Sequence, residues 1–438
     1  AVHQGGPQTG SDDFYLGATR RSDAKDSLKP TEEQIMGEIL PALKRALDDT
    51  LERDFDIISS CMVAMAKIGK DHPDFKLVDV FRARLTANNQ EIRETAALSL
   101  GIAGIIGDSE EQMDLLAGLV LDNEVGRKAS EGSQVNERTR AFAAYGLGLA
   151  AHTTSKVEVK RKAFEALKKL LEDESMNSRN LRVATIQAIS LLNVSTESQA
   201  AQAEKDLLND AVGALETYYM KKLGPGDQLL QSHCPTAIAK LIGKNHEKTE
   251  HFKNLFAADL KGRGKVKRSS RDIGRSCAMA LGQLCQPIED KKAADAEHCD
   301  LLLEQYHKAK DAQTRYFSIL ALGQIGGLEN RTVLLKEFDK AKSLEKPWCA
   351  LALGVYSFFK YDEQKQTGGA TEPEETIGET LYDEFRSTKQ PNLLSSLAIG
   401  MGLNQYVDGA DRMRQMMLEK VAQEELSGYL CGGLALMH

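Results

Sequence analysis

The stretch EIRETAALSLG, residues 91–101, carries a helical pattern that returns along the chain. Counted from Arg93, alanines stand three and four residues on, a leucine seven residues on and a glycine eight residues on. The same offsets hold small or aliphatic residues after Arg140 in ERTRAFAAYGLG (137–148) and after Arg315 in DAQTRYFSILALG (311–323). Because these offsets fall on one face of an α-helix, the stretch predicts a helix whose small residues admit a close neighbour.

The pattern defines a repeat. Looser copies end at Ala66, Ser190, Gly243, Gly282, Gly354 and Gly400, and a weak copy falls near Gly433. Good N-cap residues stand four positions before the arginine position at Asn89, Asn136, Ser178 and Asp311,. Amphipathic segments precede these helices at 33–47, 75–85, 157–171, 207–219, 298–309 and 410–424. The predicted unit is therefore helix A, a turn and helix B.

Such a unit cannot bury its apolar face alone, so successive units must stack into one continuous core. The sequence predicts an all-α fold, an α-solenoid (α-α superhelix) of about ten helical-hairpin repeats. At the quoted residues the chain resembles the HEAT-repeat family, whose pattern is a cap residue, an aliphatic–Arg pair, alanines and Leu-Gly. The resemblance covers about residues 31–438 and implies the fold but no single function. Other residues replace the arginine at Ile58, Pro235, Gly274 and Asn392.

Residues 1–30 lack the pattern and are predicted to form an extended N-terminal arm or linker. Their segment TGSDDFYLGATRR, followed by LKPTEEQI, resembles one subset of large bacterial HEAT-repeat proteins of unknown role. The first residue is not methionine, and the chain stops within an apolar run. We therefore expect residues 31–438 to be a solenoid that belongs to a longer chain.

Composition narrows the function classes. The formal net charge of -8 argues against nucleic-acid binding over the whole surface,. No apolar run reaches the length of a membrane span. The seven cysteines are scattered without metal-ligand spacing, so we expect small, buried, reduced thiols,. Reduced thiols slightly favour a cytoplasmic location, and they do not exclude export of the protein.

One segment departs from the acidic balance. KGRGKVKRSSR, residues 261–271, has six basic residues and no acid, and the repeat frame places it in the turn between a helix A and a helix B. Two other turns of this type are long, at 124–136 and 221–233. Because such turns share one edge of a solenoid, they predict a binding rim. The candidate residues for a partner or an anion are Lys261, Arg263, Lys265, Lys267, Arg268, Arg271, Lys221 and Lys222. The alternative interpretation is a solvated, mobile loop.

Catalytic, cofactor-binding and metal-binding residues are not predicted. His246 and His251 stand five residues apart, which is one too many for a zinc-binding HExxH helix,. A polar linker and helix start is the plainer interpretation of NHEKTEH (245–251). An acidic segment, 361–376, is predicted to be a mobile loop between two repeats.

The functional hypothesis is a non-enzymatic scaffold that holds a protein partner on the concave helix-B face and the rim of long turns. The first alternative is an accessory HEAT-type protein in enzymatic chemistry, as a lyase subunit or a hydroxylase. The second is binding of nucleic acid or another acidic ligand through the basic turn.

Overall fold

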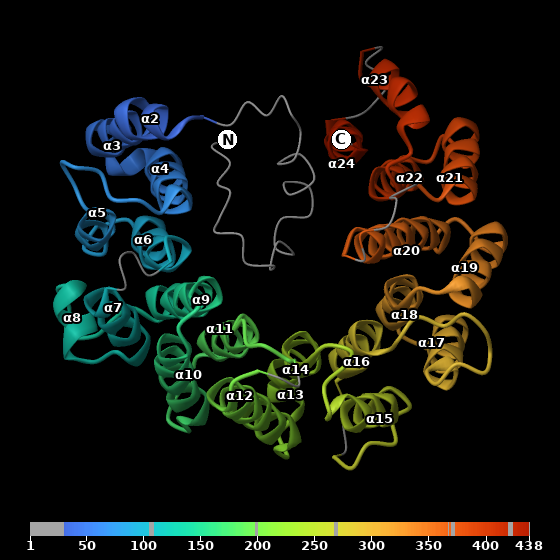
Figure 1. Cartoon of the computed structure of the whole chain (residues 1–438), viewed down its shortest axis with the longest axis horizontal. Coiled ribbons are helices and arrows are strands. Elements are labelled where there is room, and N and C mark those ends of the chain that lie inside the picture. The colour runs from blue at the N-terminus through green and yellow to red at the C-terminus, as the bar shows by residue number, and fades with distance from the viewer. Residues whose placement is uncertain are drawn as a thin grey trace. The chain divides into compact units, whose positions relative to one another are not determined.

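The computed structural model describes residues 30–104, 109–197, 200–266, 270–366, 368, 373–418 and 424–437. It is all-α, an α-solenoid of stacked helical hairpins, as the sequence predicts (Figure 1). The described part of the chain contains no strand, only an isolated bridge between His72 and Phe75. The chain divides into two compact units, which are described separately: residues 30–221 with 240–242, and residues 222–239 with 243–437.

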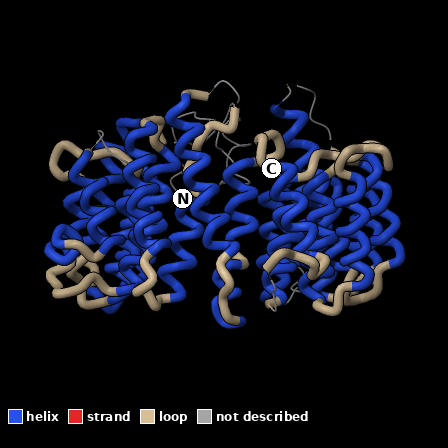
Figure 2. Tube along the Cα trace, turned by 90° about the horizontal axis from the view of Figure 1, so that it is seen from below, coloured by secondary structure: helices blue, strands red, loops and turns tan. Residues whose placement is uncertain are grey.

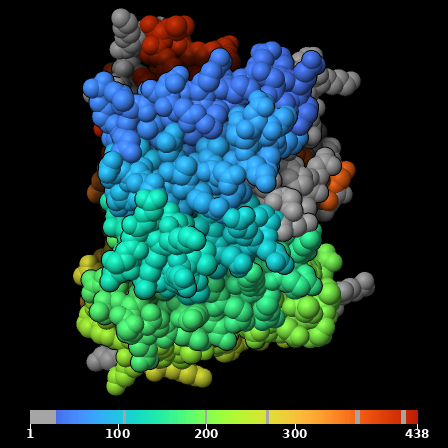
Figure 3. All heavy atoms as spheres, turned by 90° about the vertical axis from the view of Figure 1, so that its left-hand side faces the viewer, coloured from blue at the N-terminus to red at the C-terminus, as the bar shows by residue number. Residues whose placement is uncertain are grey.

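Unit 1 stacks its hairpins one after another, and Figure 3 shows them as successive bands from blue to green. The helices of these hairpins form two layers. The helix-A layer contains α2 (Glu32–Gln34), a π-helical turn (Ile35–Ile39), α3 (Leu40–Asp49), α5 (Leu77–Arg84), α7 (Glu110–Leu121), α10 (Val157–Glu172) and α12 (Gln202–Met220). The helix-B layer contains α4 (Phe55–Ile68), α6 (Gln90–Ile102), α9 (Glu137–Thr153) and α11 (Arg179–Ser190). Along the chain, a 3₁₀ turn (Glu52–Asp54) and α8 (Glu124–Ala129) each stand between a helix A and the helix B that follows it. Helix α14 (Cys234–Ile242) is divided between the two units.

Unit 2 repeats this arrangement. Its helix-A layer contains α15 (Thr249–Leu260), α17 (Ala296–Lys308), α19 (Leu328–Lys340), α21 (Glu375–Ser387) and α23 (Ala410–Leu418), the last preceded by a 3₁₀ turn (Val407–Gly409). Its helix-B layer contains α16 (Arg271–Leu284), α18 (Ala312–Ile325), α20 (Lys346–Gln366), α22 (Pro391–Asn404) and α24 (Glu424–Met437). Within this unit the helix-B layer lies on the inner side of the bend that the hairpins follow (Figure 1). Helix α13 (Pro225–Gln231) also belongs to unit 2 and contacts α16.

The helices begin where the sequence places their caps. Asn89, Asn136, Ser178 and Asp311 all accept hydrogen bonds from backbone N–H groups of the first turn, and Ser270 does the same for α16. Each bond satisfies a donor that the helix itself leaves without a partner. The predicted caps are therefore confirmed, and the hairpin turns end at defined residues.

The arginine of the repeat binds backbone carbonyls at the end of its own helix A or in the turn that follows it. Arg182 donates to the carbonyl oxygens of Leu171, Asp173 and Met176 at 2.8–3.1 Å. Arg93 donates to those of Ala87 and Asn88 at 2.5 and 2.9 Å. Carbonyls at a helix C-terminus lack intrahelical partners, so this cation closes the hairpin from the helix-B side.

The small face of helix B lets consecutive helices touch backbone to backbone. A Cβ atom placed on Gly101 would lie 1.9 Å from the carbonyl oxygen of Gly146. On Gly323 it would lie 2.4 Å from the carbonyl oxygen of Ala352. Real Cβ contacts essentially never come so close, so these positions require glycine. Cys61, Cys277 and Cys349 are buried in the same layer, as predicted.

Several local predictions need correction. Residues of two long turns form helices, α8 and α13. Gly126 lets α8 pack closely on α7 beside Gly118, and α13 buries Leu230 and contacts α16. Residues 361–366 of the expected acidic loop extend α20, while 367 and 369–372 fall outside the described residues. Cys431 is exposed, because Gly433 of α24 is the residue that meets α22 and Cys431 lies on another side of the helix,. The predicted arm, apart from Pro30, also falls outside the described residues. No helix in the described ranges is long and apolar enough to span a membrane.

Replacing Gly101 by alanine is expected to destabilise unit 1 by about 1–3 kcal/mol, because the new methyl group overlaps the α9 backbone,. The urea midpoint, followed by circular dichroism at 222 nm, measures the change. Gly213→Ala in α12 is the matched control, since a Cβ there meets nothing within 4 Å. That variant is expected to be neutral or up to about 1 kcal/mol more stable. Equal midpoints for the two variants would contradict close packing at Gly101.

Candidate functional site

The basic turn starts from a well-defined helix end. After α15 ends at Leu260, Gly262 adopts a left-handed backbone (φ 68°). The N–H groups of Gly262 and Arg263 donate to the carbonyl oxygens of Asp259 and Ala258 at 2.9 and 2.8 Å. This is the bonding of a glycine C-terminal cap, so the first cations of the turn are held at a fixed place relative to α15.

A second glycine in the turn allows a close approach. A Cβ on Gly264 would lie 1.7 Å from Oδ1 of the buried Asp259. The side chains of Lys261, Arg263 and Lys265 are exposed and make no ion pair within the described part of the chain. The turn therefore presents cations to solvent from a backbone that packs back on its own helix.

The other predicted cations are placed differently. Arg271 is the exposed first residue of α16, and Lys267 and Arg268 fall outside the described residues. Lys221 belongs to unit 1, where its ammonium lies 4.0 Å from Oε1 of Glu174 and over the Tyr218 ring. Lys222 belongs to unit 2 and is exposed.

The turn 222–233 supports the start of α16 beside the basic turn. The buried side chain of Gln228 in α13 accepts a hydrogen bond from the Ser270 N–H at 3.0 Å and donates to the Leu223 carbonyl at 3.1 Å. Burial lowers the pKa of the neighbouring His233, which keeps its ring neutral at pH 7,. Two of the three long turns thus meet at one helix N-terminus.

The helix-B layer of unit 2 has an apolar face on the side away from the helix-A layer. Its side chains are half-buried or exposed at helical spacing in α18, α20 and α22: Phe317, Leu320, Leu351, Val355, Phe358, Phe359, Ile399 and Leu403. The rings of Tyr316 and Trp348 stack between α18 and α20 with centroids 4.8 Å apart and planes 7° apart. Partly exposed apolar side chains on one face of neighbouring helices are a candidate interaction face.

A buried ionic cluster joins α15 to the connection between α16 and α17. The Lys253 ammonium is 2.6 Å from Oδ1 of Asp295, and both side chains are almost fully buried. Glu250 also pairs with Lys253. The Nδ1 atom of His298 is 3.3 Å from Oδ1 of Asp295, and the Gln286 N–H donates to Oδ2 at 2.7 Å. Asp295 therefore fixes the loop that leads from α16 to α17.

The same cluster contains a potential metal-ligand set. Ligand atoms of Cys285, Asp295 and His298 lie within 4.8 Å of one another. Burial raises the pKa of the Cys285 thiol well above its usual value. Although burial alone would raise the pKa of Asp295, hydrogen bonds from His298, Lys253 and the Gln286 N–H hold it well below its usual range. The Lys253 ammonium thus already neutralises the carboxylate, which disfavours a second cation there.

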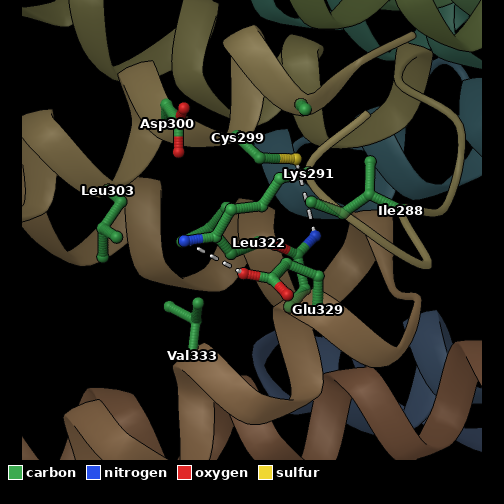
Figure 4. A pocket seen from close by; sticks show the side chains of 10 residues that line it. Ile288, Lys291, Cys299, Asp300, Leu303, Leu322, Glu329 and Val333 are labelled. Carbon is green, nitrogen blue, oxygen red and sulfur yellow. Dashed lines mark hydrogen bonds and ion pairs between the residues drawn. The ribbon is translucent and has the colours of Figure 1, made fainter. Parts of the chain in front are cut away.

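A small pocket of about 310 Å³, part of it open to solvent, lies between α17 and α19 (Figure 4). Figure 4 shows Lys291 reaching toward Glu329, with Nζ and Oε1 3.9 Å apart. Asn330 donates to the Cys299 Sγ at 3.5 Å on the pocket wall. Burial raises the pKa of Cys299 to about 12, so it is a thiol rather than a nucleophilic thiolate,. The geometry supports no acid–base or nucleophilic pair in this pocket.

Sequence reasoning did not find the ionic cluster. Its members come from α15, the end of α16 and the start of α17, and no short spacing links them. The available signal for the cluster was Lys253, a lysine next to the apolar residues of an amphipathic helix. His246 plays the plainer part expected of it: it precedes α15, and its Nδ1 accepts the Lys248 N–H at 3.2 Å.

Comparisons with known proteins identify no relative from which the function of this chain could be argued. No protein-family model matches the sequence, and no curated protein matches it. One solved structure to which the chain is similar is human deoxyhypusine hydroxylase in complex with glycerol. The identity is 13%, the match covers 82% of this chain and 95% of that chain, and the TM-score is 0.28. So low a score carries no argument about activity.

Replacing Asp295 by asparagine is expected to cost about 3–5 kcal/mol at pH 7, because Lys253 loses its closest buried partner,. The folded pKa of Asp295 lies below the unfolded one, so its stabilisation is present above about pH 4 and is lost as the pH falls through the folded pKa,. Urea unfolding from pH 7 to pH 2.5 should therefore show a shallower acid-induced loss in the variant.

Some acid dependence will remain in Asp295→Asn, because a hydrogen bond from Arg275 also lowers the pKa of Asp311. Glu297→Gln, an exposed carboxylate on α17, is the control and should unfold like the parent protein. If Asp295→Asn matched that control at every pH, the ionic cluster would not stabilise unit 2.

Proposed function

We propose that the protein is a non-enzymatic scaffold that holds a protein partner on the helix-B face of unit 2 and on the turns that border it. The observation that carries the proposal is the row of apolar side chains along α18, α20 and α22, which exposes Phe359 and half-exposes Leu320 and Leu403. Burial of such a surface by a partner would contribute about 25 cal/mol for each Å² removed from water.

The layer is also rigid enough to serve as a platform. Gly354 and Gly400 join α20 and α22 so closely that a Cβ on Gly354 would lie 2.7 Å from Gly400 Cα. Helices held at backbone contact keep their outward side chains at fixed spacing, which lowers the entropy lost on binding. Beside this platform, the pockets and clusters of the described residues offer no activated nucleophile.

The test is a variant of the apolar face. Leu320→Ser, Phe359→Ser and Leu403→Ser, combined, should reduce affinity for the natural partner at least tenfold, because interface energy concentrates in buried apolar anchors. The partner is first identified by crosslinking mass spectrometry in native lysate, with crosslinks mapped on α18, α20 and α22. Purified partner is then titrated by calorimetry.

The control variant changes three exposed apolar residues outside the helix-B layer and the turns from helix A to helix B, Leu328, Val407 and Leu418. It should bind like the parent protein, and circular dichroism should show both variants folded. Equal loss in the two variants would argue against a specific helix-B site. A stoichiometric metal or a visible chromophore in the purified protein would instead favour an accessory role in enzymatic chemistry.

A further inference from the structure

The basic turn is one end of a longer basic row. In unit 2, helices A and B alternate in direction, so every turn from A to B lies at the same edge, and Figure 2 shows loops gathered at the helix ends. The exposed cations at the four A-to-B turns from α15 to α22 define the basic edge: Lys261, Arg263, Lys265, Lys308, Lys310, Lys340, Lys342, Arg386 and Lys389.

These cations are largely unneutralised. Within the described residues Lys308 is the one member with an ion pair, to Glu304 at 3.1 Å, while Arg386 lies over the Tyr382 ring. The exposed carboxylates nearby are Glu304, Asp339 and Asp383. By contrast, half-buried cations at this edge are paired: Arg275 with Asp311 at 2.8 Å and Lys346 with Glu384 at 2.7 Å.

Helix dipoles alone do not explain the row. A cation near a helix C-terminus is favourable, and this accounts for Lys308, Lys340 and Arg386 in last turns,. However, the hairpins of unit 1 have the same dipoles, and their turns carry more acids than cations: Arg53 stands between Glu52 and Asp54, and the turn after α10 has Asp173 and Glu174 without a cation. The basic edge is therefore a property of unit 2 and not of the repeat.

We infer that the basic edge of unit 2 binds an extended, acidic polypeptide segment. This inference rests on the proposed scaffold function and names the chemistry of the partner. Neighbouring helices pack about 8–10 Å apart, so four turns span roughly 30 Å, which an extended chain covers with about eight or nine residues. Seven of the nine cations are lysines, which act as point charges and suit carboxylates along a strand of variable sequence,.

A polypeptide fits better than a nucleic acid. The Tyr316 and Trp348 rings stack on each other, and Arg386 covers Tyr382, so the row offers few free aromatic faces for bases,. The formal net charge of -8 also opposes a long polyanion, whereas a short acidic segment feels mainly the local cations,. The basic edge borders the apolar helix-B face, where the rest of a protein partner would lie.

The experiment uses a fluorescently labelled decaglutamate peptide and measures anisotropy at 50 mM and 300 mM NaCl on the full chain. Binding should weaken steeply with salt. Lys310→Ser, Lys342→Ser and Lys389→Ser, combined, should weaken it about tenfold, since three exposed ion pairs with the peptide would be lost. The control variant, Lys291→Ser, Lys292→Ser and Lys336→Ser, removes three exposed lysines outside the A-to-B turns and should bind like the parent protein.

Equal binding by parent, test and control variants would overturn the inference, because the far turns would then contribute nothing. Tighter binding of a labelled ten-nucleotide single-stranded DNA, lost in the same test variant, would also overturn it in favour of nucleic acid. If decaglutamate fails to bind while the natural partner still depends on Leu320, Phe359 and Leu403, the basic edge is refuted and the scaffold proposal stands.

Discussion

Backbone contact between successive B helices is the constraint on which the rest of this structure depends. Gly101 meets Gly146, Gly323 meets Ala352, and Gly354 meets Gly400, each at a distance that leaves no room for a Cβ atom. Such contact sets a short spacing in the B layer, while larger side chains of the A helices fill the opposite side. Within unit 2 this difference agrees with a helix-B layer on the inner side of the bend (Figure 1).

Because the helix-B layer is tightly packed, the residues that can vary in type and number lie at the ends of the helices. Hydrogen bonds from Arg93 and Arg182 tie each turn to helix B, and caps such as Asn89 and Asp311 stop the helices sharply. The turns can then change in length and charge without disturbing the core. In unit 2 this freedom produces the basic edge, and in unit 1 the corresponding turns carry more acids than cations.

The buried ion pair of Lys253 and Asp295 shows another use of the connections. A loop of eleven residues runs from Cys285 to Asp295 between α16 and α17. The Asp295 carboxylate at its end accepts a hydrogen bond from the Gln286 N–H near its start, and the ion pair with Lys253 ties the loop to α15. Carboxylate and ammonium pair directly there, and the His298 Nδ1 lies 3.3 Å from the same carboxylate oxygen. The cluster is therefore explained as a structural tie, and the apolar face of α18, α20 and α22 remains the feature that suggests function.

The sequence by itself determined the hairpin repeat, the caps and the contact face, because these depend on residues three to eight positions apart. It also located the basic turn between α15 and α16. Only the tertiary structure decided which charges act together. Lys221 turns toward Glu174 in unit 1, whereas Lys310, Lys342 and Lys389 join the edge that begins at Lys261. The reason is physical: stacking brings residues some 40 positions apart to one edge, and a linear pattern does not record which turns carry free rather than paired cations.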